Sequence, residues 1–243
     1  VADWQAADQT ELAALMPTTR RYAFDVRKII RHLFDTESFI ETRPDMGRAI
    51  ITGLARVEGR AVAVLASDCR HLGGAIDGES ATKAAALYQL AERWRLPVVS
   101  LIDTPGFMVG PESEAGGAPR LMSDLFIAGA TLTQPIVAIF LRRAYGLGAM
   151  AMTGGSFEVP RYAVSWPQGE FGAMGLEGAV HLGFRQELAE APDEGARQAL
   201  YDKLLAEMYD KGRAVEAASY LEIDAVIQPE ETRAVISRAL VTS

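Results

Sequence analysis

PVVSLIDTPGFMVG (residues 97–110) and PIVAIFLRRAYGLGAM (residues 135–150) share one plan, an apolar run that ends in a glycine-containing turn. Continuous apolar runs of this length are typical of strands buried on both faces of a parallel sheet. Residues 120–133, which lie between them, have a helical pattern, so strand, helix and strand follow in order. This order predicts an α/β fold with a parallel sheet. Ligands of such sheets lie beyond the carboxyl ends of the strands, so both glycine turns are predicted to face a binding site.

The flanking segments extend the same α/β pattern. Residues 49–68 predict two strands joined by a tight turn at Glu58-Gly59, and residues 162–167 predict a further strand. A helix is predicted over residues 80–95, with Ser80 as its N-cap. Three more helical regions are predicted: one that opens near Asp25, one over residues 185–219 with a break at 191–193, and one that Pro229 starts.

Composition narrows the class of protein. The chain has 243 residues, 49% of them hydrophobic, and a net charge of −8, which argues against a nucleic-acid partner. The single cysteine, Cys69, excludes an internal disulfide and a zinc site built from cysteines. The apolar runs are shorter than the roughly 20 residues that span a bilayer, and residues 1–12 do not resemble a signal peptide. We expect one cytoplasmic domain with no membrane partner; the missing initiator Met indicates a processed product or an excised piece of a longer chain.

Several familiar catalytic motifs are absent or incomplete. DTPG resembles the Asp-x-x-Gly switch of GTPases, but no phosphate-binding Gly-x-x-x-x-Gly-Lys loop precedes it. YGLGAM lacks the full dinucleotide-binding pattern, and Ser156 does not lie in a hydrolase nucleophile elbow. His32, His71 and His181 are scattered, without the spacing of a metal site.

Main-chain chemistry is what the two glycine turns offer. A glycine turn that opens a helix presents free N–H groups, and glycine lets the chain approach a ligand closely. Two such turns on neighbouring strands can aim several donors at one oxygen, which is an oxyanion hole. The alternative is that these glycines only permit tight turns and close packing of helix on strand.

Charged side chains near the turns also have two interpretations. Arg142 and Arg143 could bind the phosphates or a carboxylate of a ligand, or could form a solvated strand end, and Arg120 has the same two interpretations. Asp103 is expected to fix the Pro105-Gly106 turn by hydrogen bonding.

Seven motifs, in this order and spacing, carry a family resemblance: YAFDVRKIIRHLFDTESFIE, ITGLARVEGRAVAVLAS, GGAIDGESATKAAAL, LPVVSLIDTPGFMVGPESEAGG, RRAYGLGAMAM, SWPQGEFGAMGLEGAV and IDAVIQPEETR. With these motifs the chain resembles the carboxyl-terminal domain of the biotin-dependent carboxyltransferases. These are the β subunits of propionyl-CoA, methylcrotonyl-CoA and acetyl-CoA carboxylases. The resemblance implies the crotonase-like (ClpP/crotonase) fold of repeated ββα units. Such chains carry two of these domains, so residues 1–243 are expected to be the second alone, without the amino-terminal partner domain.

The resemblance also implies a reaction. A carboxyltransferase moves a carboxyl group from carboxybiotin to the α carbon of an acyl-CoA through enolates, which backbone oxyanion holes stabilise; biotin itself is the base. The backbone N–H groups of Leu147 and Gly148 are implied as the catalytic donors, and no metal is expected in this domain. The implied biotin and acyl pocket is formed by Gly106, Phe107, Gly116, Gly117, Tyr145, Gly146, Ala149 and Met150.

The implied partners are acyl-CoA, biotin carboxyl carrier and biotin carboxylase subunits, the amino-terminal carboxyltransferase domain and further copies of this chain. The acidic balance predicts that CoA mainly contacts the missing domain. Three alternatives stay open. They are a biotin-dependent decarboxylase of malonyl-type acyl-CoA, a non-catalytic assembly domain, and a crotonase-type hydratase or isomerase that would use Glu112, Glu114 or Glu170.

Overall fold

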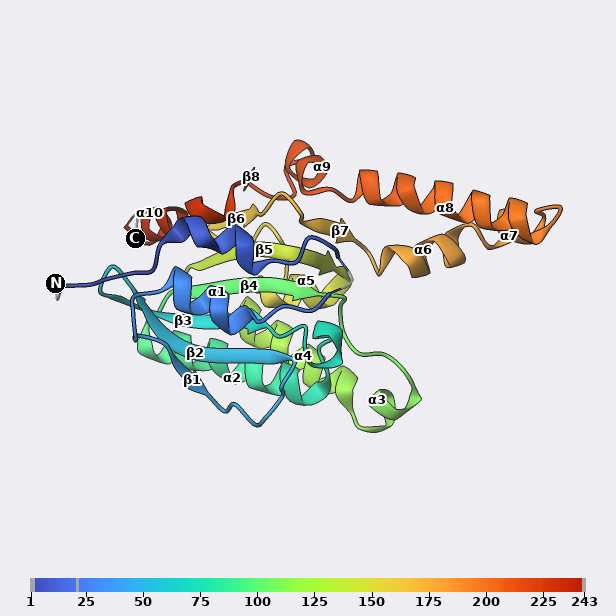
Figure 1. Ribbon diagram of the computed structural model, residues 1–243. Coiled ribbons are helices and arrows are strands. Elements are labelled where there is room, and N and C mark those ends of the chain that lie inside the picture. Colours follow the sequence, from blue (N-terminus) through green and yellow to red (C-terminus); the bar gives the residue numbers. More distant parts are fainter. Residues whose placement is uncertain (1–2, 21, 242–243) are drawn as a thin grey trace.

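A computed structural model describes residues 3–20 and 22–241 (Figure 1). In this part of the chain an eight-stranded sheet has the order β1-β2-β3-β4-β5-β6-β8, and β7 pairs with the carboxyl-terminal part of β5. The strands are β1 (Ile40–Thr42), β2 (Ile50–Val57), β3 (Arg60–Ser67), β4 (Val98–Thr104), β5 (Ile136–Tyr145), β6 (Tyr162–Ser165), β7 (Glu170–Gly172) and β8 (Ala225–Val226).

The predicted parallel sheet is confirmed from β3 onward, and the predicted hairpin at residues 49–68 forms an antiparallel edge. β1, β2 and β3 are antiparallel neighbours, and the remaining pairs are parallel. The predicted turn at Glu58-Gly59 explains the difference, because two strands joined by two residues must run in opposite directions. Both turn residues have positive φ, +52° and +78°, as such tight hairpins require.

Helices cover both faces of the sheet. The 3₁₀ helix η1 (Gln9–Leu15), α1 (Val26–Leu33) and α10 (Thr232–Val241) pack on one face, where their buried residues form a core with Val99 and Val137. On the other face, α2 (Gly78–Trp94), α4 (Ala118–Ala130) and α5 (Gly146–Met152) form a second core with Val98 and Phe140. Because neighbouring residues of β4 and β5 point into different cores, both strands are buried on two sides, as their continuous apolar runs predict.

Helix starts follow the capping rules with one correction. Asp25 caps α1 by accepting from the Arg27 amide at 3.0 Å, as predicted. The predicted N-cap of α2, Ser80, is wrong, because the helix begins at Gly78 and Asp77 is the cap. The Asp77 carboxylate accepts from the Ser80 amide at 2.8 Å, so Ser80 lies within the turn that is capped. Near the end of the chain, the 3₁₀ helix η3 (Pro229–Glu231) leads into α10, so Pro229 does open this helical segment.

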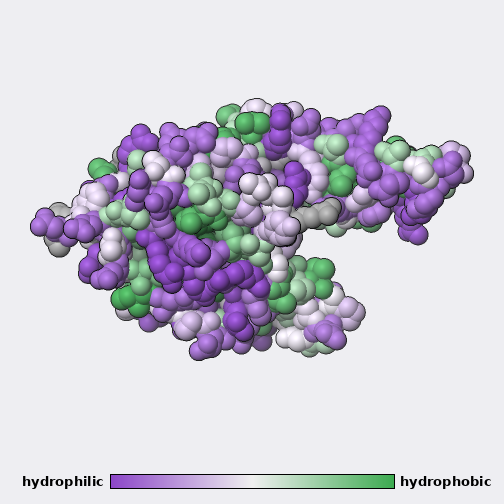
Figure 2. Space-filling model, viewed as in Figure 1, coloured by the Kyte–Doolittle hydropathy of each residue, from purple (hydrophilic) through white to green (hydrophobic). Residues whose placement is uncertain are grey.

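Residues 176–211 form an arm that projects away from the sheet (Figure 1). It consists of α6 (Leu176–Gly183), α7 (Arg185–Ala189) and α8 (Glu194–Lys211), and α9 (Ala214–Ser219) follows it. The break predicted at 191–193 lies between α7 and α8. Figure 2 shows the surface hollowed between this arm and the lobe that carries the short helix α3 (Pro111–Ala115).

Across the described ranges of the chain, each helix is too short or too polar to cross a membrane.

Candidate active site

The two glycine turns predicted to lie together are in contact. Thr104 at the end of β4 pairs with Ala144 of β5, so the two strands end at the same level. A Cβ atom added to Gly148 would lie 2.7 Å from the Cα and carbonyl carbon of Gly106, and 3.0 Å from the Phe107 nitrogen. The backbone after β5 therefore packs directly on the backbone after β4.

Helix α5 begins inside the second turn. Gly146 has φ +58°, and a Cβ there would lie 2.7 Å from the carbonyl oxygen of Ala173, so only glycine fits this bend. A helix that begins at Gly146 leaves the N–H groups of Leu147 and Gly148 without a carbonyl four residues back in the helix, and no side chain caps them. Leu147 is 62% exposed, so its side chain points away from the core. Ala149 is buried and Met150 half-buried.

The first turn is held by Thr104 rather than by Asp103. The Thr104 hydroxyl accepts from the Gly106 amide at 3.1 Å and donates to the Gly74 carbonyl at 2.7 Å. Phe107 forms an isolated bridge with Ile76, in which the Ile76 amide donates to the Gly106 carbonyl. The expectation that Asp103 fixes this turn is wrong, because its carboxylate is committed to two arginines.

Asp103 is the centre of a buried charge cluster. It accepts from Arg142 Nη2 at 2.7 Å and from Arg143 Nε at 2.9 Å, and its side chain is fully buried. Burial alone would raise the pKa of Asp103, but the hydrogen bonds from Arg143 and Arg142 outweigh it and lower that pKa. Arg142 Nη1 also donates to the carbonyl oxygens of Arg20 and Tyr22. The expectation of a solvated strand end is wrong, because both arginines bind Asp103 and so hold the ends of β4 and β5 together.

The predicted pocket residues separate into two places. The structure brings Gly106 and Phe107 together with the turn formed by residues 145–149. Gly117 instead starts α4 with φ +74°. Gly116 lines a cavity of about 870 Å³ beside Met108 and Val109, and neither Leu147 nor Gly148 lines that cavity.

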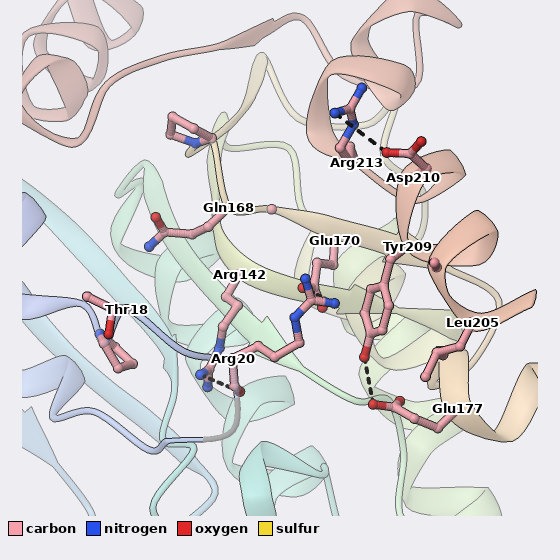
Figure 3. Close-up of a pocket in the computed structure, with 14 residues that line it drawn as sticks. Thr18, Arg20, Arg142, Gln168, Glu170, Glu177, Leu205, Tyr209, Asp210 and Arg213 are labelled. Carbon is pink, nitrogen blue, oxygen red and sulfur yellow. Dashed lines mark hydrogen bonds and ion pairs between the residues drawn. The ribbon is translucent and has the colours of Figure 1, made fainter. Parts of the chain in front are cut away.

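Tyr145 lies beneath the turn with its phenol buried. It is 3% exposed, and its hydroxyl donates to Glu170 Oε2 at 2.8 Å. Burial, and then the negative charge of Glu170, raise the pKa of Tyr145 far above its usual value. Glu170 of β7 lines a second cavity, of about 670 Å³, between the start of the chain and the arm (Figure 3).

Sequence reasoning missed the environment of Glu170. Arg20 Nη1 lies 3.3 Å from Glu170 Oε1, and the Arg20 guanidinium stacks on the ring of Tyr209 at 3.6 Å (Figure 3). These residues come from β7, the amino-terminal segment and α8, and no spacing rule connects them. The sequence offered one signal here: Glu170 is an acidic residue beside a predicted loop, which suggested a catalytic base of a hydratase or isomerase.

The carboxylates considered for a hydratase are poorly placed for that role. Glu170 is 8% exposed and held by Tyr145 and Arg20. Glu112 and Glu114 are exposed on α3. Within residues 3–20 and 22–241, no three His, Cys, Asp or Glu side chains gather as a metal site would need.

Comparisons with known proteins agree on one family. The profile described as "Carboxyl transferase domain" matches residues 1–243. The biotin-dependent acetyl-/propionyl-coenzyme A carboxylase beta6 subunit of Mycobacterium tuberculosis is 35% identical over 236 residues, which are 96% of this chain and 50% of that protein. The methylmalonyl-CoA carboxyltransferase 12S subunit of Propionibacterium freudenreichii subsp. shermanii is 31% identical over 231 residues, 95% of this chain and 44% of that subunit. The chain thus spans about half the length of the curated relatives it matches.

Solved structures give the same result for the fold. A single-chain, multi-domain long-chain acyl-CoA carboxylase superimposes with a TM-score of 0.90 and 47% identity, over 98% of this chain and 23% of that one. The transcarboxylase 12S crystal structure, described as a hexamer, has a TM-score of 0.90 and 30% identity, over 98% of this chain and 45% of that one. The predicted α/β fold of the crotonase-like class is confirmed. By a profile match along its whole length and by these structural likenesses, the chain belongs to the carboxyl transferase domain family.

Proposed function

We propose that this chain forms the carboxyl-terminal half of a carboxyltransferase that moves a carboxyl group between biotin and the α carbon of an acyl-CoA. The relatives named above are biotin-dependent carboxylase subunits and a methylmalonyl-CoA carboxyltransferase, which supports this reaction class. The observation that carries the proposal is the contact of Gly148 with the Gly106-Phe107 turn, which gathers main-chain donors at two neighbouring strand ends.

The amides of Leu147 and Gly148 are the proposed catalytic groups. Both lie in the first turn of α5, where the helix dipole adds a partial positive charge. Each would donate to an oxygen that gains negative charge in the reaction, and loss of one such donor costs about 10²–10³ in rate. Carboxybiotin would supply the transferable carboxyl group, and the biotin left behind would supply a base and the ureido oxygen that these amides would hold. Uncharged N–H donors suit an oxyanion that forms only transiently. Such donors do not bind the neutral ground state strongly, so they favour the transition state.

Other parts of the proposed site lie outside this chain. Since the chain covers about half of its relatives, we assign the main contacts to CoA to an amino-terminal carboxyltransferase half. A biotin carboxyl carrier and a biotin carboxylase would supply the carboxylated cofactor, and further copies of the chain would complete an oligomer in the cytoplasm. The hexamer described for the transcarboxylase 12S structure supports that assembly.

A pair of substitutions at Leu147 tests the proposed donor. Leu147→Ala removes only an exposed side chain, so carboxyl transfer is expected to stay within about twofold of the original rate. Leu147→Pro removes the N–H group in the first helical turn, where proline is tolerated, and is expected to lower kcat by about 10²-fold or more. The measurement uses the longest form of the protein in which the chain occurs. Malonyl-CoA and free biotin are supplied, and formation of acetyl-CoA is followed.

Three results of this assay would contradict the proposal. Equal rates for the two Leu147 variants would exclude the amide, provided that circular dichroism shows both to be folded. Hydration of an unsaturated acyl-CoA without biotin would favour the hydratase, and no reaction in any assay would favour an assembly domain.

A further inference from the structure

Glu170 lines the cavity in Figure 3, and it also accepts a hydrogen bond from Tyr145, the residue just before the proposed donor turn. We propose that Glu170 is a positioning residue for this turn, acting through the hydroxyl of Tyr145. The role of the turn rests on the proposed function; the positioning itself rests on contacts in this structure.

Tyr145 is fixed at both of its ends. Tyr145 is the last residue of β5, and its backbone pairs with Gly172 of β7. The next residue is Gly146, where α5 begins. A Cβ on Gly106 would lie 3.3 Å from the Tyr145 carbonyl oxygen, so this residue also touches the first glycine turn. At the far end of the ring, the buried hydroxyl donates to Glu170 at 2.8 Å. A shift of this ring would therefore displace the backbone from which the Leu147 and Gly148 amides follow.

Glu170 is itself held from the opposite side. Its second oxygen faces Arg20, whose guanidinium lies over the ring of Tyr209 of α8. The Tyr209 hydroxyl then donates to Glu177 of α6 at 2.6 Å (Figure 3). The carboxylate thus bridges a turn of the sheet and the arm, and its 8% exposure keeps water from replacing either partner.

A second buried tyrosine provides a matched control. Tyr88 of α2 is fully buried, and its hydroxyl donates to the carbonyl oxygen of Ala151 at 3.0 Å. Both tyrosines therefore support the same seven-residue helix, α5, but Tyr88 contacts its last turn and Tyr145 lies at its start. Tyr145→Phe and Tyr88→Phe each delete one buried hydroxyl, so a merely structural role predicts the same result for both.

The experiment compares kcat, KM, thermal stability and amide hydrogen exchange in these two variants. Tyr145→Phe is expected to lower kcat about tenfold, the worth of a buried hydrogen bond, with KM for malonyl-CoA unchanged. Exchange of the amides in the β5–β7 pairing, residues 143–145 and 170–172, should rise by a similar factor. Tyr88→Phe should lose comparable thermal stability without loss of kcat or faster exchange at those residues.

Two substitutions of the carboxylate complete the test. Glu170→Gln keeps an oxygen that accepts from Tyr145, so it should retain more kcat and more protection in the β5–β7 pairing than Glu170→Ala. Equal kcat and exchange in the two tyrosine variants, or no rescue by glutamine, would overturn the proposal. If the unsubstituted protein transfers no carboxyl group, the proposed function fails, and the exchange measurements alone still decide whether Glu170 positions the turn.

Discussion

At the scale of single residues, Gly148 is predicted to be intolerant of any side chain. In Gly148→Ala the new methyl would meet the Gly106 backbone at 2.7 Å, so one of the two turns must move. Overpacking of this kind typically costs 1–3 kcal/mol, and we expect about 2 kcal/mol lower stability together with loss of carboxyl transfer.

Gly183 is the matched control for Gly148. It ends α6, and a Cβ there would meet nothing within 4 Å. Gly183→Ala should therefore raise stability slightly, by up to about 1 kcal/mol, because alanine is the better helix former. Urea unfolding curves of both variants check this, and equal stabilities would contradict the tight contact between the turns.

Residue patterns predicted where the two glycine turns lie, but not the hydrogen bonds that hold them in place. Glycine turns after apolar strands have a recognisable spacing, so residues 106–107 and 146–148 could be placed at one sheet edge beforehand. The partners of Asp103 and Glu170 could not be predicted, because hydrogen bonds between distant side chains leave no periodic signal.

At the scale of elements, α2 and α8 are predicted to differ strongly in hydrogen exchange. They have similar lengths, 17 and 18 residues, but α2 has eight buried residues and α8 has none among its described residues. Local opening costs little where few apolar contacts are broken, so α8 amides should exchange at least about 100-fold faster than those of α2. Hydrogen exchange followed by mass spectrometry measures this. Equal protection would mean that a partner or a second copy covers the arm.

Element boundaries show why prediction succeeded for some helices and failed for others. The cap at Asp25 and the break before α8 follow from local signals, an aspartate before an apolar pattern and a proline. The predicted N-cap of α2 was three residues too late, because Asp77 and Ser80 are both good caps and local sequence does not distinguish them. β7 was missed because a three-residue strand has no pattern of its own.

At the scale of the whole molecule, a buried ion pair ties α10 to the segment that follows α1. Arg233 of α10 donates to Asp35, which follows α1, across 198 positions of sequence. The same carboxylate accepts from the amides of Glu58 and Gly59 at 2.9 and 2.8 Å, which anchors the β2–β3 turn. Long-range pairs of this kind are invisible to spacing rules, although the order of strands and helices was predictable.

This ion pair makes stability depend on pH. Burial would raise the pKa of Asp35, but Arg233 and the two amides outweigh it and lower that pKa. The unfolded chain, with an ordinary aspartate pKa of about 3.9, therefore binds more protons as the pH falls. The stabilisation from Asp35 is complete above that value and is lost as the pH falls through the lower folded pKa.

Asp35→Asn is expected to be less stable than the unsubstituted protein by about 3 kcal/mol at pH 7, because it leaves Arg233 buried without its carboxylate. The difference should shrink on acidification, since the unsubstituted protein loses the same interaction below about pH 4. Urea unfolding at pH 7, 5, 4 and 3 measures it, with Asp124→Asn, an exposed position on α4, as the control that should follow the unsubstituted protein throughout. Curves for Asp35→Asn and the unsubstituted protein that stay parallel down to pH 3 would show that Asp35 keeps an ordinary pKa in the folded state. The link between the first and last helices would then contribute nothing through its charge.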